Sequence, residues 1–180
     1  LSRGLGDVYK RQSTHDVNSW QGTSIELYGD AYKMLTAFTY IFPGMPLLYT
    51  GQEYDLNKRL LFFEKDNFIK KTGQTMRFLQ KLGKLKNTND ALSAGAGRAA
   101  YQSLTGLVNM NYGKENQIFA FKRTSLKNEV ILIANMSKNY AQFTMNFNGK
   151  FKNFSDGKFK KLSDSYEYVM KPWEYWILLN

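Results

Sequence analysis

Two stretches of this chain decide its fold: Thr14-His15-Asp16-Val17-Asn18-Ser19-Trp20 and Pro43-Gly44-Met45-Pro46-Leu47-Leu48-Tyr49-Thr50-Gly51-Gln52-Glu53. Each is a weak signal alone. In this order, with a helix-like segment between them, they are typical of the last two βα units of a barrel enzyme, where strands and helices alternate along the chain. We therefore interpret this part of the chain as the end of a (β/α)8 barrel.

The segment around the second stretch supports this interpretation. Gly29-Asp30 offers an N-cap for a helix from Ala31 to about Phe42, which is apolar on more than one side and so predicts a covered helix. Pro43-Gly44 ends the helix. Met45 to Tyr49 is a short apolar run between helix breakers, which predicts a buried parallel strand.

A long loop and a second helix are expected next. Tyr54 to Lys71 has no clear periodicity, and long loops in compact domains are often functional. Thr72 then provides a cap for a helix running to about Lys86. Its apolar residues recur at spacing three and its charged residues lie opposite, as on the outside of a barrel.

Beyond Asn87 to Ala100 the pattern changes to short strands. The expected strands are Ile118–Arg123, Val130–Ala134, the alternating sets Phe143/Met145/Phe147 and Tyr166/Tyr168/Met170, and Trp176–Leu179. Asn148-Gly149 and Asp156-Gly157 are hairpin turn signals. We therefore expect residues 13–92 to be a partial barrel, formed by its last two βα units, and residues 93–180 to be an antiparallel β sandwich.

Residues 1–12 stand apart because they show neither helical nor alternating periodicity. They resemble translated sequencing-adapter read-through, so we expect a non-native segment and exclude it from fold reasoning. The alternative is a genuine strand and loop, in which Leu5 and Val8 serve as apolar positions.

Composition limits the possible classes. The chain has 180 residues, 43% of them hydrophobic and 16% aromatic, which suits one packed domain or two small ones. No apolar run reaches the length of about 18 residues that indicates a membrane span. Cysteine is absent, which excludes disulfides and thiolate zinc sites. The net charge of +10 comes from dispersed lysines, so a solvated face is favoured over phosphate binding, which stays open.

The candidate site residues follow from the predicted strand ends. His15 and Asp16 lie where one strand would end and Glu53 where the next would end, so all three are expected at the same mouth. A carboxylate beside an imidazole, with the indole of Trp20 nearby, suits a carbohydrate. The structural alternatives are an N-cap for the His-Asp pair, a backbone support role for Glu53 and core packing for Trp20.

Three further carboxylates, Asp55, Glu64 and Asp66, are metal ligands by type. Their spacing matches no EF-hand or similar loop, and salt bridging is favoured. We therefore expect no metal site among these residues.

These motifs resemble glycoside hydrolase family 13, the α-amylase family, whose members join a (β/α)8 barrel to a C-terminal antiparallel β domain. Thr14-His15-Asp16 is similar to the family's Asn-His-Asp motif at the end of the seventh strand, with Thr14 where the family usually has Asn. The stretch from Pro43 to Glu53 resembles the eighth strand. The run Asn57 to Asp66 resembles the loop after it in bacterial α-amylases. The resemblance extends from residue 13 to the end of the chain. In the β domain it rests only on the pattern of residues along the strands.

The resemblance implies a role for each matching residue. Asp16 matches the carboxylate that stabilises the transition state and binds hydroxyls of the sugar being cleaved. His15 matches the imidazole that hydrogen-bonds the same sugar. Trp20 and Glu53 are candidates for the wall of that subsite and its support. The departure at Thr14 leaves the exact placement of His15 open.

The resemblance also implies what this chain lacks. A retaining glycosidase needs a nucleophilic carboxylate and a general acid about 5–5.5 Å apart, and in the family both come from upstream strands. We expect a C-terminal fragment of a bacterial α-amylase that cleaves α-1,4-glucosidic bonds in starch and maltooligosaccharides, inactive by itself. No cofactor is expected here, although calcium is possible in the full-length parent. A monomer is expected, and a secreted or periplasmic parent is favoured over a cytoplasmic one.

Other functions remain open. A glucan transferase or a trehalose-forming enzyme of the same family shares these motifs. A non-catalytic carbohydrate-binding module is suggested by the aromatic-rich second half, although Trp173 and Trp176 are expected mainly in its core. A nucleic-acid-binding domain rests only on the positive charge, and it predicts an affinity that falls steeply with salt.

Overall fold

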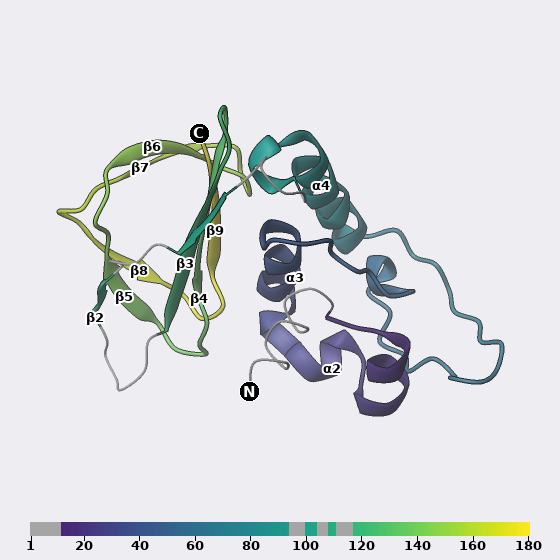
Figure 1. The fold of residues 1–180 in the computed structure, drawn as a ribbon. Helices are drawn as coiled ribbons and strands as arrows, with labels where there is room; N and C mark the ends of the chain where they lie inside the picture. Colours follow the sequence, from purple (N-terminus) through teal and green to yellow (C-terminus); the bar gives the residue numbers. More distant parts are fainter. Residues whose placement is uncertain (1–11, 94–99, 104–107, 111–116) are drawn as a thin grey trace. The chain divides into compact units, whose positions relative to one another are not determined.

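A computed structural model describes residues 12–93, 100–103, 108–110 and 117–180. The chain divides into two compact units, Leu1–Thr88 with helices and Asn89–Asn180 with strands (Figure 1). The division lies a few residues ahead of the expected boundary between 92 and 93. Most of the expected non-native segment, and the strand expected before His15, lie outside the described residues. No helix in the described part is long and apolar enough to cross a membrane.

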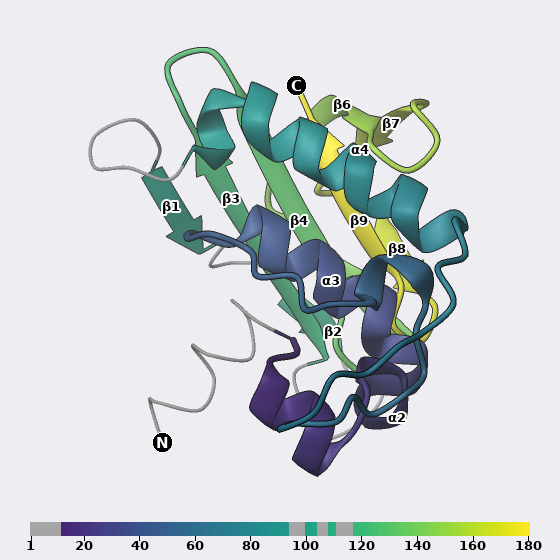
Figure 2. The same cartoon turned by 90° about the vertical axis from the view of Figure 1, so that its right-hand side faces the viewer.

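The first unit consists of helices and turns joined by loops (Figure 2). In chain order they are the π-helical turn η1 (Val17–Gln21), α2 (Ser24–Tyr28), the 3-10 turn η2 (Gly29–Ala31), α3 (Tyr32–Ile41), the 3-10 turn η3 (Gln52–Tyr54) and α4 (Gln74–Thr88).

The covered helix predicted from Ala31 to Phe42 is present as α3. Eight of its ten residues are buried, which explains why its apolar residues are not confined to one side. The expected cap is wrong: Asp30 lies within η2, and Ala31 precedes the helix without a side-chain cap bond. The end is as expected, because Phe42 turns extended before Pro43.

The parallel strand predicted at Met45 to Tyr49 is not formed in this structure. Leu47 forms only an isolated bridge. Met45, Leu47 and Leu48 are 76%, 43% and 44% exposed. A strand inside a barrel exists through hydrogen bonds to two neighbours, and no other described residue of this unit belongs to a strand. The expected barrel strands are therefore not confirmed.

The amphipathic helix predicted from Thr72 to Lys86 is present as α4. It begins two residues after Thr72, so the expected cap is wrong. Its buried side includes Leu79 and Leu82, as the spacing predicts. The Lys86 ammonium donates to the carbonyl oxygen of Tyr40 at 3.0 Å and thereby ties α4 to the end of α3.

The second unit begins with a 3-10 turn, η4 (Asp90–Leu92), and continues as two antiparallel sheets. The strands are β1 (Ala100–Ser103), β2 (Val108–Met110), β3 (Ile118–Thr124), β4 (Glu129–Asn135), β5 (Ala141–Thr144), β6 (Gly149–Asn153), β7 (Phe159–Leu162), β8 (Glu167–Met170) and β9 (Tyr175–Leu179). One sheet has the order β1-β3-β4-β9-β6-β7 and the other β2-β5-β8. Neither β1 nor β2 was predicted from the sequence.

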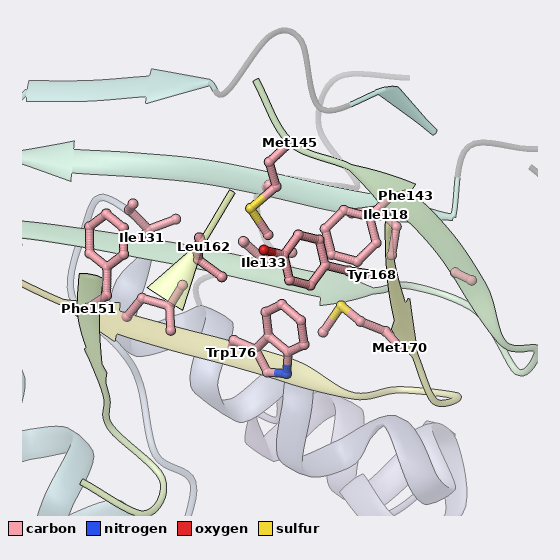
Figure 3. Close-up of a cluster of buried hydrophobic side chains, with 13 residues drawn as sticks. Ile118, Ile131, Ile133, Phe143, Met145, Phe151, Leu162, Tyr168, Met170 and Trp176 are labelled. Atoms are coloured by element: carbon pink, nitrogen blue, oxygen red, sulfur yellow. The ribbon is translucent and has the colours of Figure 1, made fainter. Parts of the chain in front are cut away.

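The core of this unit is built from alternating residues of both sheets (Figure 3). One buried hydrophobic cluster contains Ile131 and Ile133 of β4 and Trp176 of β9 from the larger sheet. It also contains Phe143 of β5 and Met170 of β8 from the smaller sheet. Such alternation is expected when two sheets bury one face each against the other. The predicted antiparallel sandwich is confirmed, and so is the expected core position of Trp176.

The two hairpin turn signals have different outcomes. Gly157 has a φ of 70° in the turn between β6 and β7, a conformation that favours glycine, as Asp156-Gly157 predicts. Asn148-Gly149 makes no hairpin, because it links β5 to β6, which belong to different sheets. The Asn148 side chain instead accepts a hydrogen bond from the backbone N–H of Asp164 at 3.1 Å.

Candidate functional site

The His15–Asp16 pair lies on a helical turn just before η1, where a strand end was expected. His15 Nε2 and Asp16 Oδ1 are 3.4 Å apart, and the two side chains are 65% and 64% exposed. Asp16 occupies the N-cap position of η1, but its side chain makes no cap hydrogen bond. The structural alternative of an N-cap therefore does not account for this carboxylate, which remains accessible for a ligand hydroxyl.

An aromatic cluster borders the pair. The ring centroid of Phe62 lies 5.3 Å from that of His15 and 5.6 Å from that of Trp20. Phe63 packs edge-on against Phe62 at 4.7 Å. Trp20 is 63% exposed, which is inconsistent with the alternative of core packing. Imidazole, indole and carboxylate thus gather at one exposed place, together with Phe62, which sequence reasoning did not single out.

The loop that carries Phe62 is held against η1 by the buried side chain of Asn18. Asn18 Oδ1 accepts from the backbone N–H of Leu60 at 2.8 Å, and Asn18 Nδ2 donates to the carbonyl oxygen of Lys58 at 3.4 Å. The Ser19 hydroxyl donates to the carbonyl oxygen of Leu60 at 2.7 Å. These bonds satisfy loop backbone groups that no strand or helix pairs. We call Asn18 and Ser19 the loop clamp.

A second tie comes from the start of α2. Thr23 and Glu26 form a capping box: the Glu26 carboxylate accepts from the Thr23 N–H at 2.8 Å, and the Thr23 hydroxyl accepts from the Glu26 N–H at 3.1 Å. The Arg59 guanidinium donates to the same carboxylate at 3.0 Å. The hydrogen bond from the Thr23 backbone, and then the one from Arg59, hold the pKa of Glu26 below its ordinary value.

A third tie closes the loop on itself. Asp66 forms an ion pair with Lys58 and accepts from the backbone N–H of Leu61 at 3.1 Å. The Lys58 bond is the main reason why the pKa of Asp66 is lowered. Asp55 accepts from the Thr75 hydroxyl. Within the described ranges no three His, Cys, Asp or Glu side chains form a group that fits a metal ion.

These ties predict a pH dependence of the loop. A carboxyl group with a lowered folded-state pKa stabilises the fold above its ordinary pKa, and this contribution is lost as the pH falls through the folded-state value. We expect the pKa values of Glu26 and Asp66 to lie below the ordinary values of their residue types, measured by carbon-13 NMR of the carboxyl groups. Lys58→Met should raise the pKa of Asp66 toward its ordinary value and leave that of Glu26 unchanged. An Asp66 pKa in the unmodified chain that is not lowered would contradict this assignment.

Glu53 has a local role in the structure. Its carboxylate accepts from the backbone N–H of Gly51 at 3.0 Å within the turn that opens η3. Gly51 has a φ of 93°, and a Cβ added there would lie 2.5 Å from a methyl carbon of Leu56, so this turn requires glycine. Among the described contacts, no hydrogen bond or ring contact joins Glu53 to the His15–Asp16 pair. The structure thus brings His15, Asp16 and Trp20 together and leaves Glu53 as a support of its own turn.

A hollow of about 310 Å³ lies beside Trp20. The loop contributes most of its lining: Arg59, Leu60, Leu61, Phe62, Phe63 and Glu64, together with Ser19. A volume of this size lies at the lower end of the range for small-molecule sites, about 300–1,000 Å³. The sequence indicated a functional loop by its length, but Phe62 and Phe63 were not predicted to be site residues.

We compared the chain with protein family models, with curated protein sequences and with solved structures. No protein family model and no curated protein sequence matches the chain. Among solved structures, the noncanonic maltogenic α-amylase AmyB from Thermotoga neapolitana matches 94% of this chain and 40% of its own, with a TM-score of 0.73 at 15% identity. In fold, this chain resembles the α-amylases. This confirms the resemblance expected from the motifs.

Two more solved structures agree with this result. The α-amylase from Geobacillus thermoleovorans, determined with acarbose, matches 98% of this chain and 42% of its own, with a TM-score of 0.64 at 17% identity. The cyclomaltodextrin glucanotransferase CldA matches 97% and 37%, with a TM-score of 0.63 at 15% identity. The chain therefore spans about 40% of the length of these α-amylase structures. The TM-scores establish a fold like that of the α-amylases. At identities of 15–17%, they do not establish the chemistry, which has to be argued from the site residues.

Proposed function

We propose that this chain is part of a glycoside hydrolase of family 13 that cleaves α-1,4-glucosidic bonds in starch-like glucans. One observation carries the proposal: the exposed His15–Asp16 pair stands beside Trp20 on a chain with the α-amylase fold. The pair occupies the positions that match the family's diagnostic motif. The strand expected at Met45 to Tyr49 forms, in this proposal, only when the neighbouring strands of the whole barrel pair with it.

The proposed chemistry assigns one role to each residue. The Asp16 carboxylate accepts hydrogen bonds from two neighbouring hydroxyls of the sugar, and these bonds strengthen as positive charge develops on the ring in the oxocarbenium-like transition state. The His15 imidazole hydrogen-bonds a hydroxyl of the same sugar. The Trp20 indole packs against the apolar face of the ring. The nucleophile and the general acid belong to other barrel strands of the whole enzyme.

The proposal is tested by glucan binding to the 180-residue chain. Asp16→Asn should weaken the binding of maltoheptaose about tenfold or more, because hydrogen bonds to a charged group contribute about 1.5–3 kcal/mol. Isothermal titration calorimetry gives the affinity. Asp30→Asn is the matched control, since Asp30 is exposed and lies in the same unit. Equal affinity of wild type and Asp16→Asn, or no binding by the wild type at millimolar maltoheptaose, would contradict the role of this pair.

The proposal also includes the absence of turnover. With soluble starch, the purified chain should release no reducing sugar, because Asp16 supplies neither the nucleophile nor the proton. Turnover that Asp16→Asn abolishes would refute this part of the proposal.

A glucan transferase is the second candidate, favoured by the match to a cyclomaltodextrin glucanotransferase. Hydrolysis and transfer differ in the acceptor that attacks the glycosyl intermediate, water or a sugar hydroxyl. Chromatography of the products formed by the whole enzyme from maltoheptaose distinguishes them. Shorter oligosaccharides alone support the hydrolase, whereas longer or cyclic products support the transferase.

A further inference from the structure

Much of the positive charge of the chain gathers in one hairpin that the proposed function does not use. The strands β6 and β7 and the turn between them, residues 149–162, contain five lysines and one aspartate, which give +4 of the net charge of +10. The five are Lys150, Lys152, Lys158, Lys160 and Lys161, and all except Lys160 are exposed. Within the described part of the chain, no ion pair joins any of them to a carboxylate.

The register of the two strands, which lie side by side (Figure 1), places three of these lysines on one face. Phe151 belongs to the buried cluster, so its neighbours Lys150 and Lys152 point away from the core. Lys161 lies directly opposite Lys150, and Phe159 directly opposite Lys152. Residues directly opposite each other share one face of a sheet. We call Lys150, Lys152, Lys161 and Phe159 the basic face.

The basic face holds like charges close together. Side chains directly opposite each other in an antiparallel pair have Cβ atoms about 4.5–5.5 Å apart, and like charges at this distance destabilise the sheet. Lys150 and Lys161 form such a pair. The ring of Phe159 offsets part of the repulsion, because Lys150 Nζ lies 4.6 Å from its centroid. A partner with several negative groups would remove the rest, so this face fits an anionic partner.

Edge protection alone does not explain this arrangement. β7 is the last strand of its sheet, and lysines on an edge strand hinder pairing with other chains. This reason applies to Lys161. It does not apply to Lys150 and Lys152, because β6 pairs with β7 on one side and with β9 on the other. Phe159 lies on the edge strand and is 66% exposed, which adds apolar surface where protection would call for charge.

We propose that the basic face binds an anionic lipid surface. Lysine ammonium groups reach the headgroup phosphates while their stems lie along apolar surface, and an exposed aromatic ring suits the boundary between headgroups and acyl chains. All four side chains point to the same side of a two-stranded ribbon, so one surface contacts them together. This inference does not depend on the proposed function.

A single-stranded nucleic acid fits the same face less well. Proteins that bind such strands stack successive bases on several aromatic side chains, and the basic face has one ring. Residues 149–162 also contain no arginine, the residue that contacts phosphate groups in a bidentate manner. The comparison favours the lipid surface, and the test includes both partners.

The proposal is tested by sedimentation of the 180-residue chain with lipid vesicles. The chain should sediment with vesicles of equal parts phosphatidylglycerol and phosphatidylcholine and stay in solution with phosphatidylcholine alone. The double variant Lys150→Gln, Lys161→Gln should lower the partition coefficient about fivefold for each lysine lost. The matched control is Lys127→Gln, Lys138→Gln, which removes the same charge from two exposed lysines of the same unit outside the hairpin. Phe159→Ser should also lower the partition coefficient.

Four results would overturn the proposal. The first is no sedimentation of the unmodified chain with the anionic vesicles, and the second is equal sedimentation with both kinds of vesicle. The third is an equal loss for the hairpin variant and its control, which would show an effect of net charge alone. The fourth is tighter binding of oligodeoxythymidine than of the vesicles, which would assign the face to nucleic acid. Because the replaced lysines are exposed, each double lysine variant should keep its circular dichroism spectrum.

Discussion

Phe143→Ala is expected to lower the free energy of unfolding of the β unit by about 3–5 kcal/mol, the usual cost of removing a buried phenylalanine. Phe143 is fully buried at the centre of the sandwich. Its ring lies 5.7 Å from that of Tyr168 and 6.0 Å from that of Trp176 (Figure 3). Truncation removes these contacts and leaves a cavity that two hydrogen-bonded sheets cannot close. Hydrogen exchange of the β4 amides measures the loss within this unit.

Controls for this prediction come from the same strand region. Tyr140→Ala removes an exposed aromatic residue and should change the stability by no more than about 0.5 kcal/mol. Phe143→Leu keeps most of the buried volume and should cost clearly less than Phe143→Ala. If Phe143→Ala and Tyr140→Ala had equal effects on β4 exchange, the sandwich core would be placed wrongly.

Asn135→Asp is expected to be the second large effect. The Asn135 side chain is fully buried at the end of β4. Its Nδ2 donates to the carbonyl oxygens of Asn139, Met170 and Lys171 at 2.6, 3.4 and 2.9 Å. Its Oδ1 accepts from the backbone N–H of Ser137 at 3.1 Å and from the Ser137 hydroxyl at 2.9 Å. One amide therefore joins the turn after β4 to the segment after β8.

Aspartate keeps the acceptor and replaces the donor with an oxygen that faces three carbonyl groups. We expect a loss of about 2–4 kcal/mol at neutral pH, from the lost bonds and the buried unpaired charge. Burial and the carbonyl groups would raise the folded-state pKa of the new carboxyl group. The loss should therefore be small below about pH 4, the ordinary pKa of aspartate, and should grow as the pH rises toward the folded-state value.

Urea unfolding of the variant at a series of pH values measures this loss. Asn139→Asp is the matched control: its side chain is exposed, and only its backbone takes part in the network. A loss for Asn135→Asp that does not depend on pH would show that the carboxyl group is solvated and that the network is placed wrongly.

The β half was the more predictable part of the fold. Alternation at Tyr168 and Met170 and at Phe143 and Met145 gives the faces of strands directly, because side-chain direction in a strand has a period of two. The paired faces of two sheets then bury these positions. The strands β1 and β2 were not predicted, and β6 and β7 were indicated only by the turn signal Asp156-Gly157 between them.

The helical half shows the limit of local pattern. Met45 to Tyr49 has the composition of a buried strand, yet Met45, Leu47 and Leu48 are exposed, and within this segment only Leu47 forms a bridge. Helix α3 forms where predicted because its hydrogen bonds lie within its own segment. A parallel strand instead depends on neighbours that are distant in sequence.

The sequence alone determined the His15–Asp16–Trp20 motif, the two long helices and the strand faces of the sandwich, because periodicity and short motifs are local properties of the chain. Only the tertiary structure decided that Asn18 clamps a loop some 40 residues away, that Phe62 stands between His15 and Trp20, and that Glu53 supports its own turn. The reason is physical: a hydrogen bond to a backbone group depends on where the fold leaves that group unpaired, and no local pattern records it.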